Sequence, residues 1–377
     1  MSHQKCGQDQ KFMQIALDLA KQGIYTTTPN PSVGCVLVKD SKIIGKGFHF
    51  KAGQPHAEVM ALVDAQKNNY DVEGATAYVT LEPCSHFGRT PPCAKGLINA
   101  KVARVVIAME DPNPQVAGKG IAMLEKAGIS TKVNVLMDQA EELNKAFLTR
   151  MRTGKPLVQL KMAMSMDGKT AMANGESKWI TGELARQDVQ HLRAQASAIL
   201  STSQTVLADD PLLNVRHEQF SQTLQQQYKK SDIRQPIRVI LDNQHQVQPN
   251  HRLFQVNSPV WLVSHKERDL SNFPIHCEQI ILSSSKKDDL LQLIEILGSK
   301  QINSVWVEAG AKLAGSLIKQ HLVDEFILYI APKLLGHEAR DLCYLPQIKT
   351  LSEAIYWQLK DIEHFNSDVK LRYQKVD

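Results

Sequence analysis

The sequence predicts two α/β domains in tandem, and three observations lead to that prediction. The chain has 377 residues, which exceeds what a single hydrophobic core usually organises. In both halves, apolar segments of strand length alternate with segments of helical period. The run Thr153-Gly154-Lys155-Pro156 is the clearest boundary signal in the chain. We therefore expect one domain at residues 1–150 and a second at residues 151–377.

The first domain begins with a helix, because Phe12, Ile15, Ala16 and Leu19 recur at helical spacing and Gly23 follows as a stop. Helices and strands then alternate to the end of the domain, which predicts three layers with a sheet between helices. The expected strands lie at 33–38, 42–47, 76–81, 104–108 and 131–135, and the expected helices at 57–65, 94–100, 120–127 and 143–152.

The second half shows the same alternation and predicts another α/β domain. Its expected strands lie at 157–162, 198–200, 237–241, 260–263 and 304–307, with helices at 182–195, 290–297 and 311–320. The Gln-rich stretch 217–231 is typical of a loop or an insertion.

The composition excludes several classes of protein. Hydrophobic residues make up 43% and charged residues 22%, which is typical of a folded globular protein. The net charge of +5 is spread without a long basic run, so we expect no nucleic-acid partner. A small anionic substrate would suit this charge, although any single lysine is more simply a solvated surface residue.

Neither export nor membrane insertion is expected from the sequence. Residues 1–8 contain no apolar core of a signal peptide, and no apolar stretch approaches the roughly 20 residues of a spanning helix. We therefore expect a cytoplasmic protein whose six cysteines stay reduced and can bind metal.

One histidine and two cysteines form the chemical motif of the first half. His56 lies two residues before Glu58 at a helix start, Cys84 follows a strand, and Cys93 follows a Pro-rich loop. One imidazole and two thiolates leave a zinc ion one open position for water, as in a catalytic rather than a structural site. Zinc lowers the pKa of such a water, and Glu58 can carry its proton to a departing amine.

The motif matches the general zinc deaminase pattern only in part. The pattern H-x-E is present, but eight residues separate Cys84 from Cys93 where the general pattern has two. The two cysteines could instead be small buried hydrophobic residues, and His86 could replace His56 as a ligand.

No G-x-G-x-x-G fingerprint follows a strand in the second half, so a Rossmann dinucleotide site is not predicted. Residues 305–316 instead run from a strand into a helix through small residues, whose free N–H groups could hold a phosphate. Close packing of the helix on the strand is the alternative explanation of these small residues.

Several motifs of the first half resemble the bifunctional riboflavin biosynthesis family known as RibD. They are residues 28–34 (TPNPSVG), 55–58 (PHAE) and 85–93 (SHFGRTPPC). The resemblance implies a cytidine-deaminase-like fold that deaminates diaminohydroxyphosphoribosylaminopyrimidine, with Zn²⁺ on His56, Cys84 and Cys93 and with Glu58 as proton shuttle. Asn30 would hydrogen-bond the ring, although a turn residue between two prolines is the simpler interpretation. Arg89 would bind the substrate phosphate, with a surface salt bridge as the alternative.

The second half resembles the reductase domain of the same family through residues 161–169, 177–181 and 207–216. The resemblance implies a dihydrofolate-reductase-like domain in which NADPH passes a hydride to the anomeric carbon of the sugar and opens ribose to ribityl. It implies the cofactor contacts Ala163, Trp179, Thr205, Asp209, Asn243, Gly310, Ala311, Lys312, Leu313, Ala314, Gly315 and Ser316. It implies the substrate contacts Ser177, Arg193, Leu213, Arg216 and Glu308.

Two acidic residues are possible aids to the reduction. Asp167 and Asp209 could take part, but a turn residue and a helix cap, respectively, explain them equally well. Arg193 and Arg216 can bind a phosphorylated sugar with two hydrogen bonds each.

Two other functions compete with this interpretation. A transfer-RNA deaminase would use the same zinc and the same Glu58, but the chain has no basic cluster and has a large second domain. A non-catalytic zinc module would require a fourth protein ligand. We expect a small phosphorylated pyrimidine as partner and a homo-oligomer, with a dimer as the first choice for an enzyme of this size.

Overall fold

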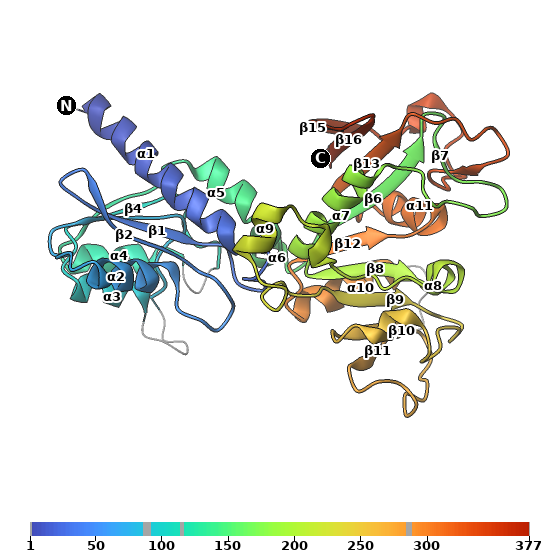
Figure 1. Cartoon of the computed structure of the whole chain (residues 1–377), viewed down its shortest axis with the longest axis horizontal. Helices are drawn as coiled ribbons and strands as arrows, with labels where there is room; N and C mark the ends of the chain where they lie inside the picture. Colours follow the sequence, from blue (N-terminus) through green and yellow to red (C-terminus); the bar gives the residue numbers. More distant parts are fainter. Residues whose placement is uncertain (1, 86–91, 114–116, 284–288, 377) are drawn as a thin grey trace. The chain divides into compact units, whose positions relative to one another are not determined.

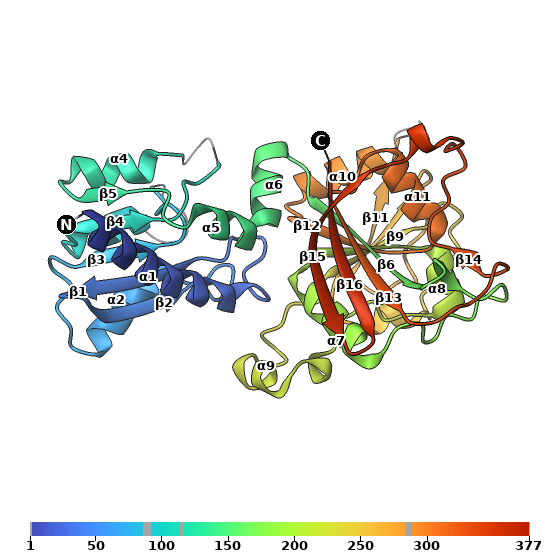
Figure 2. The ribbon, with the colours of Figure 1, turned by 90° about the horizontal axis from the view of Figure 1, so that it is seen from above.

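The computed structural model describes residues 2–85, 92–113, 117–283 and 289–376 (Figures 1 and 2). The chain divides into two compact units, Met1–Gly154 and Lys155–Asp377. No helix in the described ranges combines the length and the apolar character needed to cross a membrane.

The first unit is a five-stranded sheet with helices on both faces (Figure 1). The strand order is β2-β1-β3-β4-β5, and only β1 pairs antiparallel with its neighbours. The strands are β1 (Gly34–Lys39), β2 (Lys42–Phe48), β3 (Thr76–Val79), β4 (Arg104–Ile107) and β5 (Ser130–Lys132). The helices are α1 (Ser2–Ala20), η1 (Lys21–Gly23), α2 (Ala57–Lys67), α3 (Cys93–Asn99), α4 (Lys119–Lys126), α5 (Met137–Leu143) and α6 (Lys145–Thr153).

Successive side chains of β1 point to opposite faces of the sheet, and each face has its own hydrophobic core. Cys35 and Leu37 face the core under α2, α3 and α4, while Val36 and Val38 face the core under α1, α5 and α6. The three-layer arrangement expected from the sequence is therefore confirmed. The β1–β2 hairpin turns through Asp40 and Ser41, whose φ values of 50° and 62° suit a tight two-residue turn.

The second unit contains a nine-stranded sheet in the order β11-β10-β9-β8-β12-β6-β13-β16-β15. The strands from β11 to β13 run parallel, whereas β16 and β15 add an antiparallel edge (Figure 2). The strands are β6 (Leu157–Ser165), β8 (Ala198–Thr202), β9 (Ile237–Leu241), β10 (Val260–Ser264), β11 (Cys277–Ile281), β12 (Ser304–Glu308), β13 (Glu325–Ala331), β15 (Trp357–Phe365) and β16 (Asp368–Lys375).

Helices cover both faces of this sheet, and each face has its own core. The helices are α7 (Glu183–Gln195), α8 (Ser203–Asp209), α9 (Gln222–Gln227), α10 (Asp289–Ser299) and α11 (Ala311–Lys319), with short turns η2 (His217–Gln219), η3 (Arg252–Gln255) and η4 (Leu351–Glu353). A separate two-stranded sheet joins β7 (Lys169–Ala171) and β14 (Arg340–Asp341).

The helix expected at 143–152 is confirmed as α6, but the helix α5, which ends just before it, was not expected. The two helices meet at Asn144, whose side chain bonds the backbone of Ser32. The stretch 217–231, expected as a loop or an insertion, contains the short helices η2 and α9 and buries Phe220 and Tyr228. The strands β13, β16 and β15 were not expected at all.

Candidate active sites

His56, Cys84 and Cys93 meet in the first unit, and their ligand atoms all lie within 4.8 Å of one another. The Nδ1 atom of His56 lies 3.3 Å from Cys93 Sγ and 3.8 Å from Cys84 Sγ. Within the described ranges, no further His, Cys, Asp or Glu joins this group. One imidazole and two thiols are a donor set that suits zinc and leaves a position for water.

The packing of α2 on β2 places His56. A Cβ on Gly47 would lie 2.4 Å from the Ala57 carbonyl oxygen, so only glycine allows this close approach. His56 is the residue that precedes the first turn of α2. Cys93 begins α3, and its N–H donates to Cys84 Sγ at 3.3 Å, which brings the two thiols together despite their separation in sequence.

Glu58 lies in the first turn of α2 and is only 3% exposed. Burial raises the pKa of its carboxyl to about 7, although the nearby His56 opposes this rise. The hydrogen bonds that Cys93 and His56 direct to the Cys84 sulfur outweigh burial and lower the pKa of that thiol. The thiolate is the form of cysteine that binds metal.

His49 connects Asn30 to the metal group, because it contacts both Asn30 and His56. His49 was not among the residues expected from the sequence. The Asn30 Nδ2 atom is 3.1 Å from His49 Nε2, and the His49 ring lies edge-on to that of His56 with centroids 5.2 Å apart. His49 is 3% exposed, whereas Asn30 is half-buried. Arg89 and His86 lie outside the described residues.

Glu82 is a second residue that sequence reasoning missed, although it directly precedes the Pro83-Cys84 pair. Its buried carboxylate accepts four backbone N–H groups, from Asp111, Gly118, Gly120 and Ile121, at 2.8–3.3 Å. The same carboxylate therefore holds the start of α4 next to the strand that leads to Cys84.

In the second unit, Arg193 and Glu308 form a buried ion pair with two hydrogen bonds of 2.6 and 2.7 Å. The remaining Arg193 nitrogen donates to the Asn214 carbonyl, so this guanidinium is satisfied within the protein. Burial raises the pKa of Glu308, but Arg193, Lys161 and a Trp306 hydrogen bond outweigh it and hold the pKa at about 2.

Arg216 differs from Arg193, because its guanidinium makes no hydrogen bond or ion pair within the described part of the chain. Its backbone N–H donates to Gln190 on α7. Burial and the nearby positive charge of Arg193 lower the pKa of Arg216. Of the other expected substrate contacts, Leu213 is 3% exposed and Ser177 is half-buried.

The expected cofactor residues fall mainly at one edge of the parallel sheet. Ala163, Thr205, Asn243 and Gly310 lie near or just beyond the carboxyl ends of β6, β8, β9 and β12, respectively. This is the edge at which open α/β sheets bind ligands. Trp179 follows β7, is 58% exposed and stacks on Arg186 at 4.6 Å.

The run Gly310–Ser316 divides between packing and exposure. Leu313 and Ala314 belong to a hydrophobic core, and a Cβ on Gly315 would lie 2.0 Å from the Tyr344 carbonyl oxygen. The Ser316 hydroxyl donates to the Lys312 carbonyl inside the helix. Leu313, Ala314 and Gly315 therefore match the close-packing explanation, whereas Gly310, Lys312 and Ser316 are exposed and Ala311 is half-buried.

The two acidic candidates have other tasks. The Asp167 carboxylate accepts the N–H groups of Leu335 and Gly336 and the hydroxyl of Ser165, and these bonds hold its pKa at about 2. These contacts fit the turn interpretation of Asp167. Asp209 ends α8 and pairs with Lys178 at 3.6 Å, whereas Thr202 caps the start of that helix. The helix-cap interpretation of Asp209 was therefore wrong.

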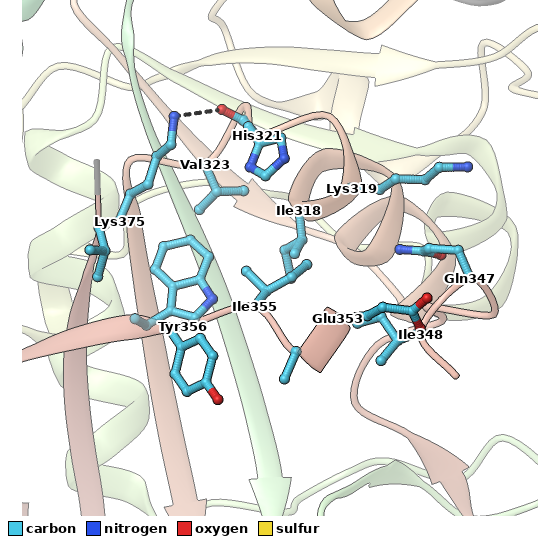
Figure 3. Close-up of a pocket in the computed structure, with 13 residues that line it drawn as sticks. Ile318, Lys319, His321, Val323, Gln347, Ile348, Glu353, Ile355, Tyr356 and Lys375 are labelled. Atoms are coloured by element: carbon cyan, nitrogen blue, oxygen red, sulfur yellow. Dashed lines mark hydrogen bonds between the residues drawn. The ribbon is translucent and has the colours of Figure 1, made fainter. Parts of the chain in front are cut away.

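A cavity of about 640 Å³ lies in the second unit, and none of the expected substrate or cofactor residues lines it (Figure 3). It is lined by the end of α11, by His321 and Val323 before β13, and by Tyr356 and Trp357 at β15. Because His321 and Val323 precede β13, this cavity lies at the amino ends of the parallel strands. That is the edge opposite the one at which α/β sheets bind ligands.

The fold and the metal group define a class of protein, a zinc-dependent deaminase unit joined to an α/β unit. Comparison with known proteins names the class more closely. Residues 6–109 match the cytidine and deoxycytidylate deaminase zinc-binding region, and residues 156–371 match the RibD C-terminal domain.

Relatives extend this match to the whole chain. The riboflavin biosynthesis protein RibD of Haemophilus influenzae is 63% identical over 97% of both chains. The solved structure of Acinetobacter baumannii RibD is 44% identical, covers 99% of this chain and 100% of that one, and superimposes with a TM-score of 0.90. The solved structure of a diaminohydroxyphosphoribosylaminopyrimidine deaminase/5-amino-6-(5-phosphoribosylamino)uracil reductase from Thermotoga maritima is 34% identical, with a TM-score of 0.87 and the same coverage.

The chain belongs to the RibD family of riboflavin biosynthesis proteins. It is a bifunctional enzyme, with a zinc-dependent deaminase and an NADPH-dependent reductase. The family resemblance and the cofactors expected from the sequence are confirmed, as are the two fold types.

Proposed function

We propose that the first unit deaminates diaminohydroxyphosphoribosylaminopyrimidine and that the second reduces the ribosyl chain of the resulting aminouracil to ribityl phosphate. The observation that carries the deaminase proposal is the convergence of His56, Cys84 and Cys93 beside the buried carboxyl of Glu58. The proposal of this particular substrate is supported by the two activities for which the Thermotoga maritima relative is named.

In the first reaction, water adds to the ring carbon that carries the amine, and ammonia leaves. Zinc, when bound by His56, Cys84 and Cys93, supplies a Lewis acid that lowers the pKa of water. Glu58 takes the proton of the attacking water and delivers it to the departing nitrogen, because its carboxyl lies next to the ligands without being one of them. Asn30 holds the ring, and Arg89 binds the phosphate.

In the second reaction, NADPH would supply a hydride for the anomeric carbon, whose bond to the ring oxygen breaks while that oxygen takes a proton. The hydride chemistry belongs to the cofactor, and the protein orients the two molecules. The residues at the carboxyl edge of the sheet, from Ala163 to the start of α11, would hold NADPH, together with Trp179, Asp209 and Ser316. Leu313, Ala314 and Gly315 pack α11 in place.

The substrate of this second step is held by Ser177, Leu213, Arg216 and the Arg193–Glu308 pair. Arg216 is the phosphate anchor, because it is the arginine of this group whose guanidinium keeps its donors unused. The Arg193 guanidinium positions Glu308 and Asn214 around the sugar and does not itself bind the phosphate.

The test is a single assay of the purified protein with zinc, the phosphoribosylaminopyrimidine and NADPH, in which ammonia release and the loss of nicotinamide absorbance are followed together. Both signals are expected, and a chelator should remove ammonia release while reduction of the supplied aminouracil continues. Ammonia release without NADPH oxidation would contradict the proposed second step. Release of ammonia from an adenosine-containing transfer RNA would favour the rival deaminase.

We also propose a cytoplasmic homodimer. Reduced thiols at Cys84 and Cys93 suit the cytoplasm. The strand β15 supports the dimer, because it ends the large sheet and exposes Leu359 (44%) and Ile362 (51%). The unpaired backbone of an edge strand is a template for pairing with a second chain, and Leu359 and Ile362 would add apolar contacts among the charged side chains of β15. Light scattering should give a dimer that Ile362→Lys weakens and that Ile275→Lys, in an exposed loop, leaves intact.

A further inference from the structure

His49 is a buried histidine of the deaminase unit that uses both ring nitrogens. Its Nδ1 atom lies 3.1 Å from the carbonyl oxygen of Pro55, and its Nε2 atom lies 3.1 Å from Asn30 Nδ2. The ring is 3% exposed and contacts His56 edge-on. Neither the family match nor the motifs give this residue a role.

The partners of His49 fix its tautomer. A carbonyl oxygen only accepts a hydrogen bond, so Nδ1 must carry the proton and donate it to Pro55. A neutral imidazole carries one ring proton, so a ring that donates from Nδ1 presents the lone pair of Nε2 to the Asn30 amide.

The same polarity fixes the Asn30 side chain. An amide can rotate by half a turn and exchange its oxygen and nitrogen, and the hydrogen-bond partners decide between the two orientations. The lone pair of His49 Nε2 attracts the NH₂ group and repels the oxygen. Asn30 Oδ1 is then the atom left for a ligand, and it has no partner within the described residues.

We propose that His49 is a positioning residue that sets the amide orientation of Asn30, so that an acceptor and not a donor meets the pyrimidine. The deaminase site then selects a ring edge that offers an N–H or NH₂ hydrogen to Asn30. This inference rests on the proposed function, in which Asn30 contacts the ring.

The tautomer itself is tested without substrate. In a ¹⁵N-labelled, zinc-loaded full-length protein, long-range ¹H–¹⁵N spectra distinguish an Nδ1–H ring from an Nε2–H ring. The His49 signals are identified by their absence from His49→Phe. An Nδ1–H pattern is expected, and an Nε2–H pattern would overturn the proposal whatever the activity of the enzyme.

A double-mutant cycle tests whether His49 acts through Asn30. His49→Phe keeps the aromatic contact with His56 but frees the amide, so deaminase kcat/KM should fall about ten-fold, as expected for one lost hydrogen bond. Asn30→Ala should cause a larger fall. In the Asn30→Ala background, His49→Phe should cause no further loss, because the amide that it orients is gone.

Two results would sink this part of the proposal. A further ten-fold loss in the double variant would mean that His49 meets the substrate itself. Equal activity of His49→Phe and His49→Gln would also contradict it, because Gln at position 49 can again accept from Asn30 and should recover part of the loss. Zinc content and reductase turnover of the same chains should stay unchanged in every variant.

The two failures remain distinguishable. If the wild-type protein releases no ammonia from the pyrimidine, the proposed function fails, and the tautomer spectrum still decides the state of His49. If ammonia is released but His49→Phe causes the same loss with and without Asn30, the deaminase function is retained and the positioning role of His49 is rejected.

Discussion

The two units place their functional residues in different ways. In the deaminase unit, the metal ligands and Glu58 lie within 38 positions, between His56 and Cys93, and they meet at the starts of α2 and α3 and at the loop that carries Cys84. In the reductase unit, the proposed contacts extend from Ala163 to Ser316 and are set along the edge of a nine-stranded sheet.

This difference follows from the chemistry of the two reactions. A metal needs particular atoms at one point, so the ligand types are rare and recognisable. Hydride transfer is carried by the cofactor, so the protein supplies a surface made of ordinary residues. The deaminase should therefore fail sharply when one group is changed, whereas the reductase should lose binding or stability in steps.

The largest effect is expected at Glu58. Glu58→Gln keeps the shape of the side chain but cannot move a proton, so deaminase kcat should fall by about 10²–10⁴-fold. Zinc content should be unchanged, because Glu58 is not a ligand. Reduction of added aminouracil by the same sample should continue.

Glu125→Gln, an exposed residue of α4, is the matched control and should retain full deaminase activity. Substantial ammonia release by Glu58→Gln would remove Glu58 from its proposed role and weaken the contrast between the two units.

The second largest effect concerns the buried Arg193–Glu308 pair. Glu308→Gln leaves a buried guanidinium without its counter-charge, and breaking such a pair costs about 3–5 kcal/mol of unfolding free energy. All four tryptophans, at positions 179, 261, 306 and 357, lie in the reductase unit. Urea unfolding followed by tryptophan fluorescence therefore reports this unit alone.

The exposed pair of Lys155 and Glu295 provides the control, and Glu295→Gln should change the unfolding free energy by less than about 1 kcal/mol. Deaminase activity should survive Glu308→Gln. Equal unfolding midpoints for the two variants would show that the Arg193–Glu308 pair does not stabilise the fold.

The share of the fold and of the site that the sequence predicts also differs between the units. The alternation of helices and strands could be read wherever an element has one buried face, as in α2. The metal group could be read because His, Glu and Cys stand at functional spacing. His49 could not, because its role depends on the Pro55 carbonyl and on Asn30, which only the folded chain brings together.

The antiparallel edge of the reductase sheet was missed for a physical reason. β15 is exposed along nearly its whole length, so no alternation of burial marks it as a strand. β13 is the opposite case, a continuous apolar run that periodicity alone cannot separate from a buried helix. The run Gly310–Ser316 shows a third limit, since small residues that pack and small residues that bind look alike in sequence.

A smaller effect is expected at Arg216. Arg216→Ala removes a proposed phosphate anchor, so the reductase KM for the aminouracil should rise about ten-fold while kcat changes little. Lys229→Ala, an exposed cation of the same unit, should leave KM unchanged. An unaltered KM in Arg216→Ala would place the phosphate elsewhere and leave Arg193 as the next candidate.

The smallest effect concerns stability of the deaminase unit in acid. Burial raises the pKa of Asp9, but Arg104 and Lys132, each 2.8 Å away, outweigh it and lower the pKa below its usual value near 4. A lowered folded-state pKa stabilises the protein above the unfolded pKa, and this contribution is lost as the pH falls through the folded pKa. Asp9→Asn should therefore be less stable at pH 7, by about 1 kcal/mol because water screens the partly exposed cations.

The difference between the wild-type protein and Asp9→Asn should shrink as the pH falls below about 4, where Asp9 of the unfolded chain begins to take up its proton, and should vanish below the lowered folded-state pKa. Urea unfolding by far-ultraviolet circular dichroism measures it, and tryptophan fluorescence identifies the reductase transition so that the remaining change belongs to the deaminase unit. A difference that stays constant down to about pH 3 would mean that the charge of Asp9 does not stabilise this unit. Acid sensitivity would then have to come from other carboxyl groups in both units, and the contrast between them would rest on catalysis alone.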